Sequence, residues 1–205
     1  MRITADAKKA TRERILEVAQ RRFQDKGFDE TKIRDIAAEV GMATGTLFNY
    51  FASKEEVAVT LAEAAISSAE QEFVKKRREG ASLSEDLFLQ AATQLRHLRR
   101  LRKFIQPVID TALAMPAVSS DRKGGPQIVS QHLQAVAEIL RAHEIDPEKW
   151  SMTAPIYWAL YVGVLKFWGH DKSPKQEDTL AMLDQSMNMF VSWLESGASS
   201  SRPLS

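Results

Sequence analysis

Apolar residues recur along this chain with the period of a helix rather than with the alternation of a strand. The clearest case is residues 31–54, TKIRDIAAEVGMATGTLFNYFASK. Four apolar residues there share one helical face at the i, i+3, i+4 and i+7 positions: Ile33, Ile36, Ala37 and Val40. Gly41 interrupts this face, and a second short run begins at Thr44. Two short helices joined by a turn that contains glycine form a helix-turn-helix, because glycine adopts the positive φ of a sharp turn.

The same period continues through the rest of the chain and predicts an all-α fold of about nine helices. A three-helix domain that contains the helix-turn-helix is expected over residues 1–54, a larger helical domain over 55–196, and a disordered tail over 197–205. Besides the helix-turn-helix pair, the expected helices cover residues 7–26, 53–76, 84–97, 104–115, 127–143, 147–169 and 174–195.

Local signals mark several of the expected helix ends. Gly27 lies where the C′ residue of the first helix is expected. Thr31 is expected to cap the N-terminus of the second helix. Ser53 and Glu56 form the S-x-x-E pattern of a capping box at the start of the fourth.

The outward face of the second helix of the helix-turn-helix carries small and polar residues that can approach a DNA edge or phosphate. They are Thr44, Gly45, Thr46, Asn49 and Tyr50. In this motif the second helix enters the major groove and its N-terminal residues meet the bases. The spacing alone fits a plain helical hairpin equally well.

The residues after Gly41 favour DNA binding over a plain hairpin. The run GMATGTLFNYFASKEEV resembles the recognition segment of TetR-family transcriptional repressors, Gly-Val-Ser-x-Gly-x-Leu-Tyr-x-Tyr/His-Phe-x-Ser/Asn-Lys-Glu-x-Leu. The matching positions are Gly41, Gly45, Leu47, Tyr50, Phe51, Ser53, Lys54 and Glu55. The departures are Met42, Ala43, Phe48 and Val57. Phe48 lacks the hydroxyl with which the family's usual tyrosine can bond a phosphate. The resemblance covers residues 12–61.

The resemblance also implies contacts with the DNA backbone. The start of the second helix at Thr31 would face a phosphate, and Lys32 and Arg34 would strengthen that contact. Lys54, at the start of the next helix, is a candidate phosphate clamp. For Lys32 and Arg34 a solvated helix face is an equally good interpretation.

Charge and composition limit the other possibilities. Residues 1–54 carry eleven lysines and arginines against eight aspartates and glutamates, a net charge of +3, whereas the remaining residues carry −2. A basic head on a slightly acidic body fits a domain that meets phosphates. The chain has no cysteine, which excludes disulfides. It has no apolar stretch near the ~18 residues of a membrane span, so we expect a cytoplasmic protein.

The last two expected helices carry more apolar surface than one small domain can hide. In TetR-like proteins these helices pair with their mates in a four-helix bundle, so the resemblance implies a homodimer. The expected interface is Trp158, Val162, Leu165, Leu183, Met187, Phe190 and Leu194. An internal core is the alternative for each of them. A second apolar stripe on the last helix consists of Met182, Met189 and Trp193.

The resemblance also implies a pocket among the fourth to eighth helices. Its expected lining is Phe88, Phe104, Met115, Trp150, Tyr157 and Tyr161. Aromatic and methionine side chains favour apolar or flat ligands. The dense basic segment 96–103 is expected to be a solvated junction between helices rather than a second DNA contact.

The resemblance therefore implies a sequence-specific DNA-binding transcriptional regulator, in the first place a dimeric repressor that a small apolar or aromatic ligand releases from a palindromic operator in double-stranded DNA. No phosphate-binding loop, nucleophile elbow or H-E-x-x-H motif is present. Glu72, Asp110 and His132 are scattered, so we expect no enzyme activity, cofactor or metal. The alternatives are an all-α small-molecule-binding protein or enzyme without DNA binding, and a helical module that binds protein.

Overall fold

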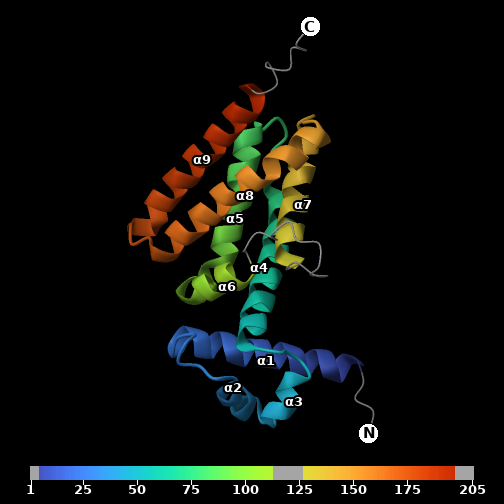
Figure 1. The fold of residues 1–205 in the computed structure, drawn as a ribbon, viewed down its shortest axis with the longest axis vertical. Coiled ribbons are helices and arrows are strands. Elements are labelled where there is room, and N and C mark those ends of the chain that lie inside the picture. The colour runs from blue at the N-terminus through green and yellow to red at the C-terminus, as the bar shows by residue number, and fades with distance from the viewer. Residues whose placement is uncertain (1–4, 113–126, 197–205) are drawn as a thin grey trace.

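The computed structural model describes residues 5–112 and 127–196, and within these ranges every regular element is a helix (Figure 1). Nine are α-helices, and two short segments, η1 and η2, are 3-10 helices. Their bounds are α1 Ala5–Asp25, α2 Ile33–Val40, α3 Thr44–Phe48, α4 Lys54–Lys76, α5 Leu83–Leu98, η1 Arg99–Phe104, α6 Ile105–Ala112, α7 Gln127–Ala142, α8 Pro147–His170, η2 Pro174–Gln176 and α9 Glu177–Ser196. The all-α prediction is confirmed. The predicted tail 197–205 lies outside the described residues.

Helices α1, α2 and α3 form a head at one end of the molecule (Figure 1). Its core is apolar and fully buried, and includes Ile15, Phe23, Ile36 and Leu47. Gly27 and Gly41 end α1 and α2 with φ of 92° and 83°, a backbone conformation that favours glycine. Both predicted glycine turns are therefore confirmed.

Helix α4 rises from the head into the helical body (Figure 1). The Ser53 hydroxyl accepts the N–H of Glu56 at 3.2 Å, as the capping box predicts. The Glu56 carboxylate accepts the N–H of Ala52 rather than that of Ser53. The domain boundary predicted at residues 54 and 55 falls at the first turn of α4 and stays a prediction.

The head is joined to the body a second time, through η1. Phe104 packs edge-on against Phe23, with ring centroids 5.1 Å apart, and stacks on Phe28 at 6.5 Å. Lys103 donates to the main-chain oxygen of Gln24 at 3.3 Å. The prediction that Phe104 lines a ligand pocket is therefore wrong, because its ring fills the joint between head and body.

The basic segment 96–103 is also more than a solvated junction. Arg102 donates from Nε to the main-chain oxygen of Trp168 at 2.8 Å and from Nη2 to that of Asp171, so it caps the C-terminus of α8. Arg96 pairs with Glu72 at 2.7 Å. The prediction of a solvated junction holds for Arg99 and Arg100, which are exposed, but not for the whole segment.

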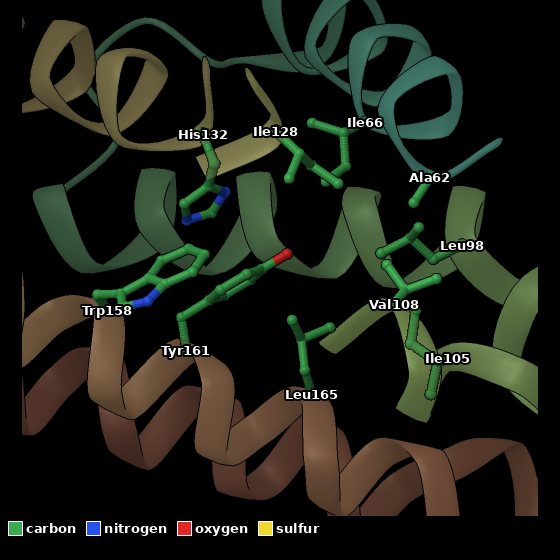
Figure 2. Close-up of a pocket in the computed structure, with 10 residues that line it drawn as sticks. All are labelled: Ala62, Ile66, Leu98, Ile105, Val108, Ile128, His132, Trp158, Tyr161 and Leu165. Atoms are coloured by element: carbon green, nitrogen blue, oxygen red, sulfur yellow. The ribbon is translucent and has the colours of Figure 1, made fainter. Parts of the chain in front are cut away.

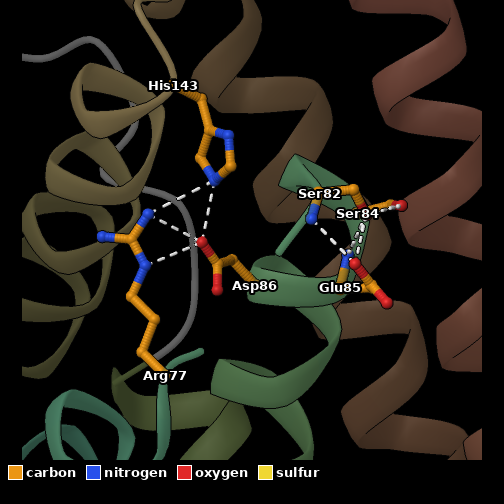
Figure 3. Close-up of polar contacts among 6 residues, drawn as sticks. All are labelled: Arg77, Ser82, Ser84, Glu85, Asp86 and His143. Atoms are coloured by element: carbon orange, nitrogen blue, oxygen red, sulfur yellow. Dashed lines mark hydrogen bonds and ion pairs between the residues drawn. The ribbon is translucent and has the colours of Figure 1, made fainter. Parts of the chain in front are cut away.

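Three helix ends meet at the far end of the body (Figure 3). The carboxylate of Asp86, on α5, is buried and accepts from Arg77, which follows α4, at 2.8 Å. It also lies 2.8 Å from Nε2 of His143, which follows α7. This cluster fixes the ends of α4 and α7 on the first turn of α5.

Helices α8 and α9 form the outer pair of the body (Figure 1). Six of the seven residues predicted for the dimer interface are buried within the single chain: Trp158, Leu165, Leu183, Met187, Phe190 and Leu194. Val162 is half-buried. These side chains form the protein's own core, which is the alternative that the sequence leaves open for them. The exposed apolar residues of the two helices are others: Met152, Ile156 and Phe167 on α8, and Leu180, Met182, Met189 and Trp193 on α9.

None of the helices within residues 5–112 and 127–196 contains an apolar stretch that could span a lipid bilayer.

Candidate functional site

The outer surface of the helix-turn-helix is built by α2, the Gly41 turn and α3. Leu47 of α3 and Ala37 of α2 are both buried, so these faces of the two helices are turned inward. The opposite face of α3 is open: Gly45, Thr46 and Asn49 are exposed, while Thr44 and Tyr50 are half-buried. These five predicted DNA-binding residues therefore lie together on one surface.

Phe48 belongs to the same surface, since the residue is 48% exposed. It stands next to Asn49 on the side of α3 that faces away from the head core. Its ring can make an apolar contact, such as that with a thymine methyl group, but donates no hydrogen bond.

Thr31 is not the N-cap of α2 that the sequence predicts. Its side chain is fully buried, and its hydroxyl donates to the main-chain oxygen of Gly27 at 2.7 Å. The cap of α2 is Lys32, whose backbone N–H donates to the Asp35 carboxylate at 3.2 Å. Thr31 thus ties the loop before α2 to the end of α1, and its hydroxyl is not available to a phosphate.

Lys54 is also engaged within the protein. Its ammonium donates to the main-chain oxygens of Phe28 at 2.8 Å and Thr31 at 3.3 Å. It also lies 4.3 Å from the centroid of the Phe28 ring. The lysine holds the loop between α1 and α2, which corrects the expected phosphate clamp.

Lys32 and Arg34, the other two predicted phosphate contacts, make fewer contacts within the protein than Lys54 does. Lys32 is exposed, and Arg34, with 70% of its side chain exposed, makes a long ion-pair contact of 3.8 Å with Asp35. On the other side of α2, Glu39 pairs with Arg21 and Arg22, and the hydrogen bond from Arg21 lowers the pKa of Glu39. Positive charge that can meet an anion is therefore found at the start of α2.

A second candidate site lies inside the body, between α4, α5, α6, α7 and α8 (Figure 2). It is a cavity of about 10 Å³, which is room for about one water molecule. Its lining is aliphatic on one side and aromatic on the other: Ala62, Ile66, Leu98, Ile105, Val108, Ile128, His132, Trp158, Tyr161 and Leu165. Figure 2 shows His132 of α7 over the rings of Trp158 and Tyr161 of α8.

Polar side chains gather around the aromatic side of this cavity. The Tyr161 hydroxyl donates to Gln94 at 2.7 Å, and His132 stacks on Tyr161 with ring centroids 4.1 Å apart. Among the described residues, nine buried side-chain atoms of the body have no hydrogen-bond partner. They belong to Glu70, Gln90, Thr93, Gln94, His132, Tyr157 and Trp158.

These side chains are uncharged, apart from the carboxyl group of Glu70. Burial lowers the pKa of His132 to about 3, so its imidazole is neutral at physiological pH. Burial also raises the pKa of Tyr157 and that of Tyr161. Burial raises the pKa of Glu70, against the effect of its hydrogen bond from Gln131.

The predicted ligand-binding residues are thus only partly together. Tyr161 lines the cavity, Tyr157 is buried beside it, and Trp150 meets Tyr157 edge-on at 5.8 Å. Phe88 instead lines a separate groove of about 440 Å³ between α5, the end of α8 and α9. Met115 lies outside the described residues.

The sequence prediction missed the polar half of the cavity. The sequence names His132 only as one of three scattered residues, but its ring contacts Tyr157, Trp158 and Tyr161. Gln90 and Gln94 are four residues apart on the face of α5 that also buries Leu87 and Ala91. Two amides on a buried helical face are a signal that sequence alone provides. In the described parts of the chain, no group of three acidic or histidine side chains could hold a metal ion.

Comparison with known proteins relates both sites to one family. Residues 15–61 match the family described as bacterial regulatory proteins, tetR family, and residues 92–202 match the tetracyclin repressor-like C-terminal domain. Over 43 residues, 21% of this chain, the sequence is 44% identical to the HTH-type transcriptional repressor KstR2 of Mycobacterium tuberculosis. That match spans 22% of the length of the relative.

Solved structures resemble the fold over most of the chain. A TetR transcriptional regulator from Rhodococcus sp. RHA1 has a TM-score of 0.66 and 21% identity, and the match covers 89% of this chain and 97% of that one. Thermus thermophilus FadR, a TetR-family transcriptional repressor solved with lauroyl-CoA, has a TM-score of 0.62 and 20% identity, with 88% and 93% covered.

Proposed function

We propose that this chain, which belongs to the TetR family of bacterial regulatory proteins, is a dimeric, sequence-specific DNA-binding repressor that a small apolar or aromatic ligand releases from its operator. The observation that carries this proposal is the open face of α3 at the end of the head, opposite a buried Leu47. Membership of the family favours a regulator over an enzyme. The cytoplasm, where the DNA is, would be its place of action.

In this proposal α3 enters the major groove of a palindromic operator. Gly45, Thr46 and Asn49 would approach base edges, because they are exposed on α3 and at its C-cap. Thr44 and Tyr50 would bond the flanking backbone. Lys32 and Arg34 would meet phosphates, since both cations lie at the start of α2 with their charged ends accessible.

A gel-shift titration on the DNA upstream of the protein's own gene tests DNA recognition. Asn49→Ala should weaken binding by about 1–3 kcal/mol, the usual value of a side chain that reads a base edge. Lys32→Ala should reduce the salt slope by about one. The matched control Lys172→Ala, an exposed lysine just after α8, should change neither.

Binding that lacks sequence preference and salt dependence would refute the repressor. If such a protein still bound a small molecule, the alternative of an all-α binding protein or enzyme would replace it.

The dimer is proposed to form through the exposed apolar faces of α8 and α9. Met189 and Trp193 are 56% and 45% exposed, and Ile156 and Phe167 are 43% and 42% exposed. Side chains of this size gathered on two neighbouring helices mark an interaction surface. A two-fold axis there would give two copies of α3 that read half-sites about 34–36 Å apart, or a multiple of that distance.

Sedimentation equilibrium tests the dimer. Met189→Glu should convert the protein to a monomer and abolish tight operator binding. Val74→Glu is the control, because Val74 is 74% exposed on α4, away from α8 and α9. A wild-type protein that sediments as a monomer would contradict the proposal.

A further inference from the structure

Three helices of the body carry buried hydrogen-bonding groups that have no partner among the described residues. Two of these residues line the cavity itself, His132 of α7 and Trp158 of α8. The others are buried on the same helices: Gln94 of α5, which bonds the lining residue Tyr161, Gln90 and Thr93 of α5, and Tyr157 of α8. All six side chains are buried. Within the described residues, the hydrogen bond that the cluster does make joins the Tyr161 hydroxyl to Gln94.

A buried polar group without a partner destabilises a protein, and native proteins contain few of them. Both nitrogens of His132 and both amide atoms of Gln90 are without a partner among the described residues. A buried water makes about three hydrogen bonds, and this cavity has room for about one water. A single water therefore leaves several of these groups without a partner, and they remain available to the polar end of a ligand.

The charge of the side chains that line the cavity limits which ligands can bind there. Among the described residues, no lysine or arginine lines the cavity, and the imidazole of His132 is neutral because burial lowers its pKa to about 3. An anionic group placed here would lose its water without gaining a cation, which is strongly unfavourable. The available partners are amide, imidazole, phenol, hydroxyl and indole groups, which bond uncharged oxygen and nitrogen atoms well.

The residues on the opposite side of the cavity limit the chemistry of the rest of the ligand. Ala62 and Ile66 of α4, Ile105 and Val108 of α6, and Ile128 of α7 are apolar (Figure 2). This side offers contacts to hydrocarbon only. The lining is therefore split between one hydrogen-bonding end and one hydrocarbon end.

We propose that the effector of this protein is an uncharged molecule with a hydrocarbon body and a hydroxyl or carbonyl group at one end. The oxygen would bind between His132 and the α5 amide of Gln94, both of which contact Tyr161, and the body would lie among the aliphatic residues of α4 and α6. This inference rests on the proposed function, because it names the chemical class of the effector. It excludes an anionic group at the buried end.

Ligand entry must enlarge the cavity, since pockets for small molecules usually have ≈ 300–1,000 Å³. Helix α6 forms one wall through Ile105 and Val108. It directly follows Phe104, which packs on Phe23 of the head. An expanded cavity would therefore press on the joint between body and head, which gives the ligand a route to α3.

Isothermal titration calorimetry of the full chain with three matched probes tests the ligand class. They are 4-propylphenol, propylbenzene and 4-propylbenzoate, which share one body and differ in the end group. The phenol should bind at least tenfold tighter than propylbenzene, and the benzoate should bind weakest. In His132→Phe the advantage of the phenol should fall below threefold, while propylbenzene binds as before.

Gln94→Met gives an independent variant should His132→Phe fail to fold, and its phenol advantage should fall in the same way. His170→Phe is the control, because His170 is exposed at the end of α8, and it should keep the full advantage. Equal binding of phenol and propylbenzene, tightest binding of the benzoate, or binding of none of the three would overturn the inference.

The same preparations are assayed for operator binding, which separates this inference from the proposed function. Operator binding without a preference for the phenol refutes only the ligand class. A preference for the phenol without operator binding supports the ligand class and refutes the repressor.

Discussion

Two clusters of buried polar side chains in the helical body differ in whether their hydrogen bonds are made. In the Asp86 cluster, both Arg77 and His143 lie 2.8 Å from one carboxylate oxygen (Figure 3). The His132 cluster consists of Gln90, Thr93, Gln94, His132, Tyr157, Trp158 and Tyr161. Its imidazole stacks on Tyr161, but neither nitrogen of the imidazole has a partner among the described residues (Figure 2). Both clusters include a histidine and bury polar atoms, so burial alone does not distinguish them.

The difference shows what each cluster contributes. The Asp86 cluster joins the ends of three helices, and its polar groups are satisfied within the chain, as expected where a buried network stabilises a fold. The His132 cluster joins the middles of α5, α7 and α8 and leaves its polar groups open, as expected where a binding site is maintained at a cost in stability. Removing a bonded group from the Asp86 cluster and removing an unpartnered group from the His132 cluster should therefore have opposite effects on stability.

The largest effect is expected from Arg77→Met. The substitution keeps an apolar stem but leaves the Asp86 carboxylate, which is 1% exposed, with His143 as its remaining partner. Removing one partner of a buried ion pair leaves an uncompensated charge, so the free energy of unfolding should fall by about 3 kcal/mol. Urea denaturation followed by circular dichroism measures this change.

The neighbouring Arg78→Met is the matched control. Arg78 is exposed and makes no ion pair or side-chain hydrogen bond with the described residues, so its replacement should change stability by less than about 0.5 kcal/mol. Equal losses in the two variants would show that the Asp86 ion pair contributes nothing measurable to stability.

The second effect is a dependence on pH that comes from His132. Its pKa is about 3 in the folded protein, because burial disfavours the imidazolium, whereas the unfolded chain has the ordinary value of about 6.5. Below pH 6.5 the unfolded state binds a proton that the folded state does not. The free energy of unfolding therefore falls as the pH falls from 6.5 towards 3, by about 2 kcal/mol between pH 7 and pH 5.

Urea denaturation of the wild type and of His132→Phe at pH 7 and pH 5 isolates this contribution. The variant should lose about 2 kcal/mol less than the wild type over this interval, since it has no imidazole to protonate. The control His170→Gln removes an exposed histidine and should behave as the wild type. Identical pH dependence in wild type and His132→Phe would show that His132 is not buried as a neutral group.

The head could be predicted from sequence because its signals are local. Gly27 and Gly41 end helices with positive φ, and Ser53 caps α4, all within a few residues of the helix that each one limits. Thr31 was misassigned for a local reason too. A threonine before a helix can cap it or bond back to a preceding carbonyl, and here it bonds to Gly27.

The body was predicted less well because its sites depend on how helices pack. Helix α9 has two apolar stripes, and periodicity does not say which one faces its own chain. Met187, predicted for the dimer interface, is buried in the chain's own core, whereas Met189 of the second stripe is exposed. His132 and Gln94 are 38 residues apart and come together only because α7 and α5 both bring side chains to Tyr161 of α8.

The smallest effect distinguishes two tyrosines one helical turn apart on α8. The Tyr157 hydroxyl is buried without a partner among the described residues, whereas the Tyr161 hydroxyl donates to Gln94 at 2.7 Å. Tyr157→Phe removes an unpaired group and should raise the free energy of unfolding by about 1 kcal/mol. Tyr161→Phe should lower it by about 1 kcal/mol, because Gln94 then loses its donor.

The two variants control for each other, since each removes one hydroxyl from a fully buried ring of the same helix. Urea denaturation at pH 7 measures both, and opposite signs are the expected result. A loss of stability in Tyr157→Phe as large as that in Tyr161→Phe would mean that the Tyr157 hydroxyl is satisfied in solution. The His132 cluster would then resemble the Asp86 cluster, and its open hydrogen bonds would no longer indicate a ligand site.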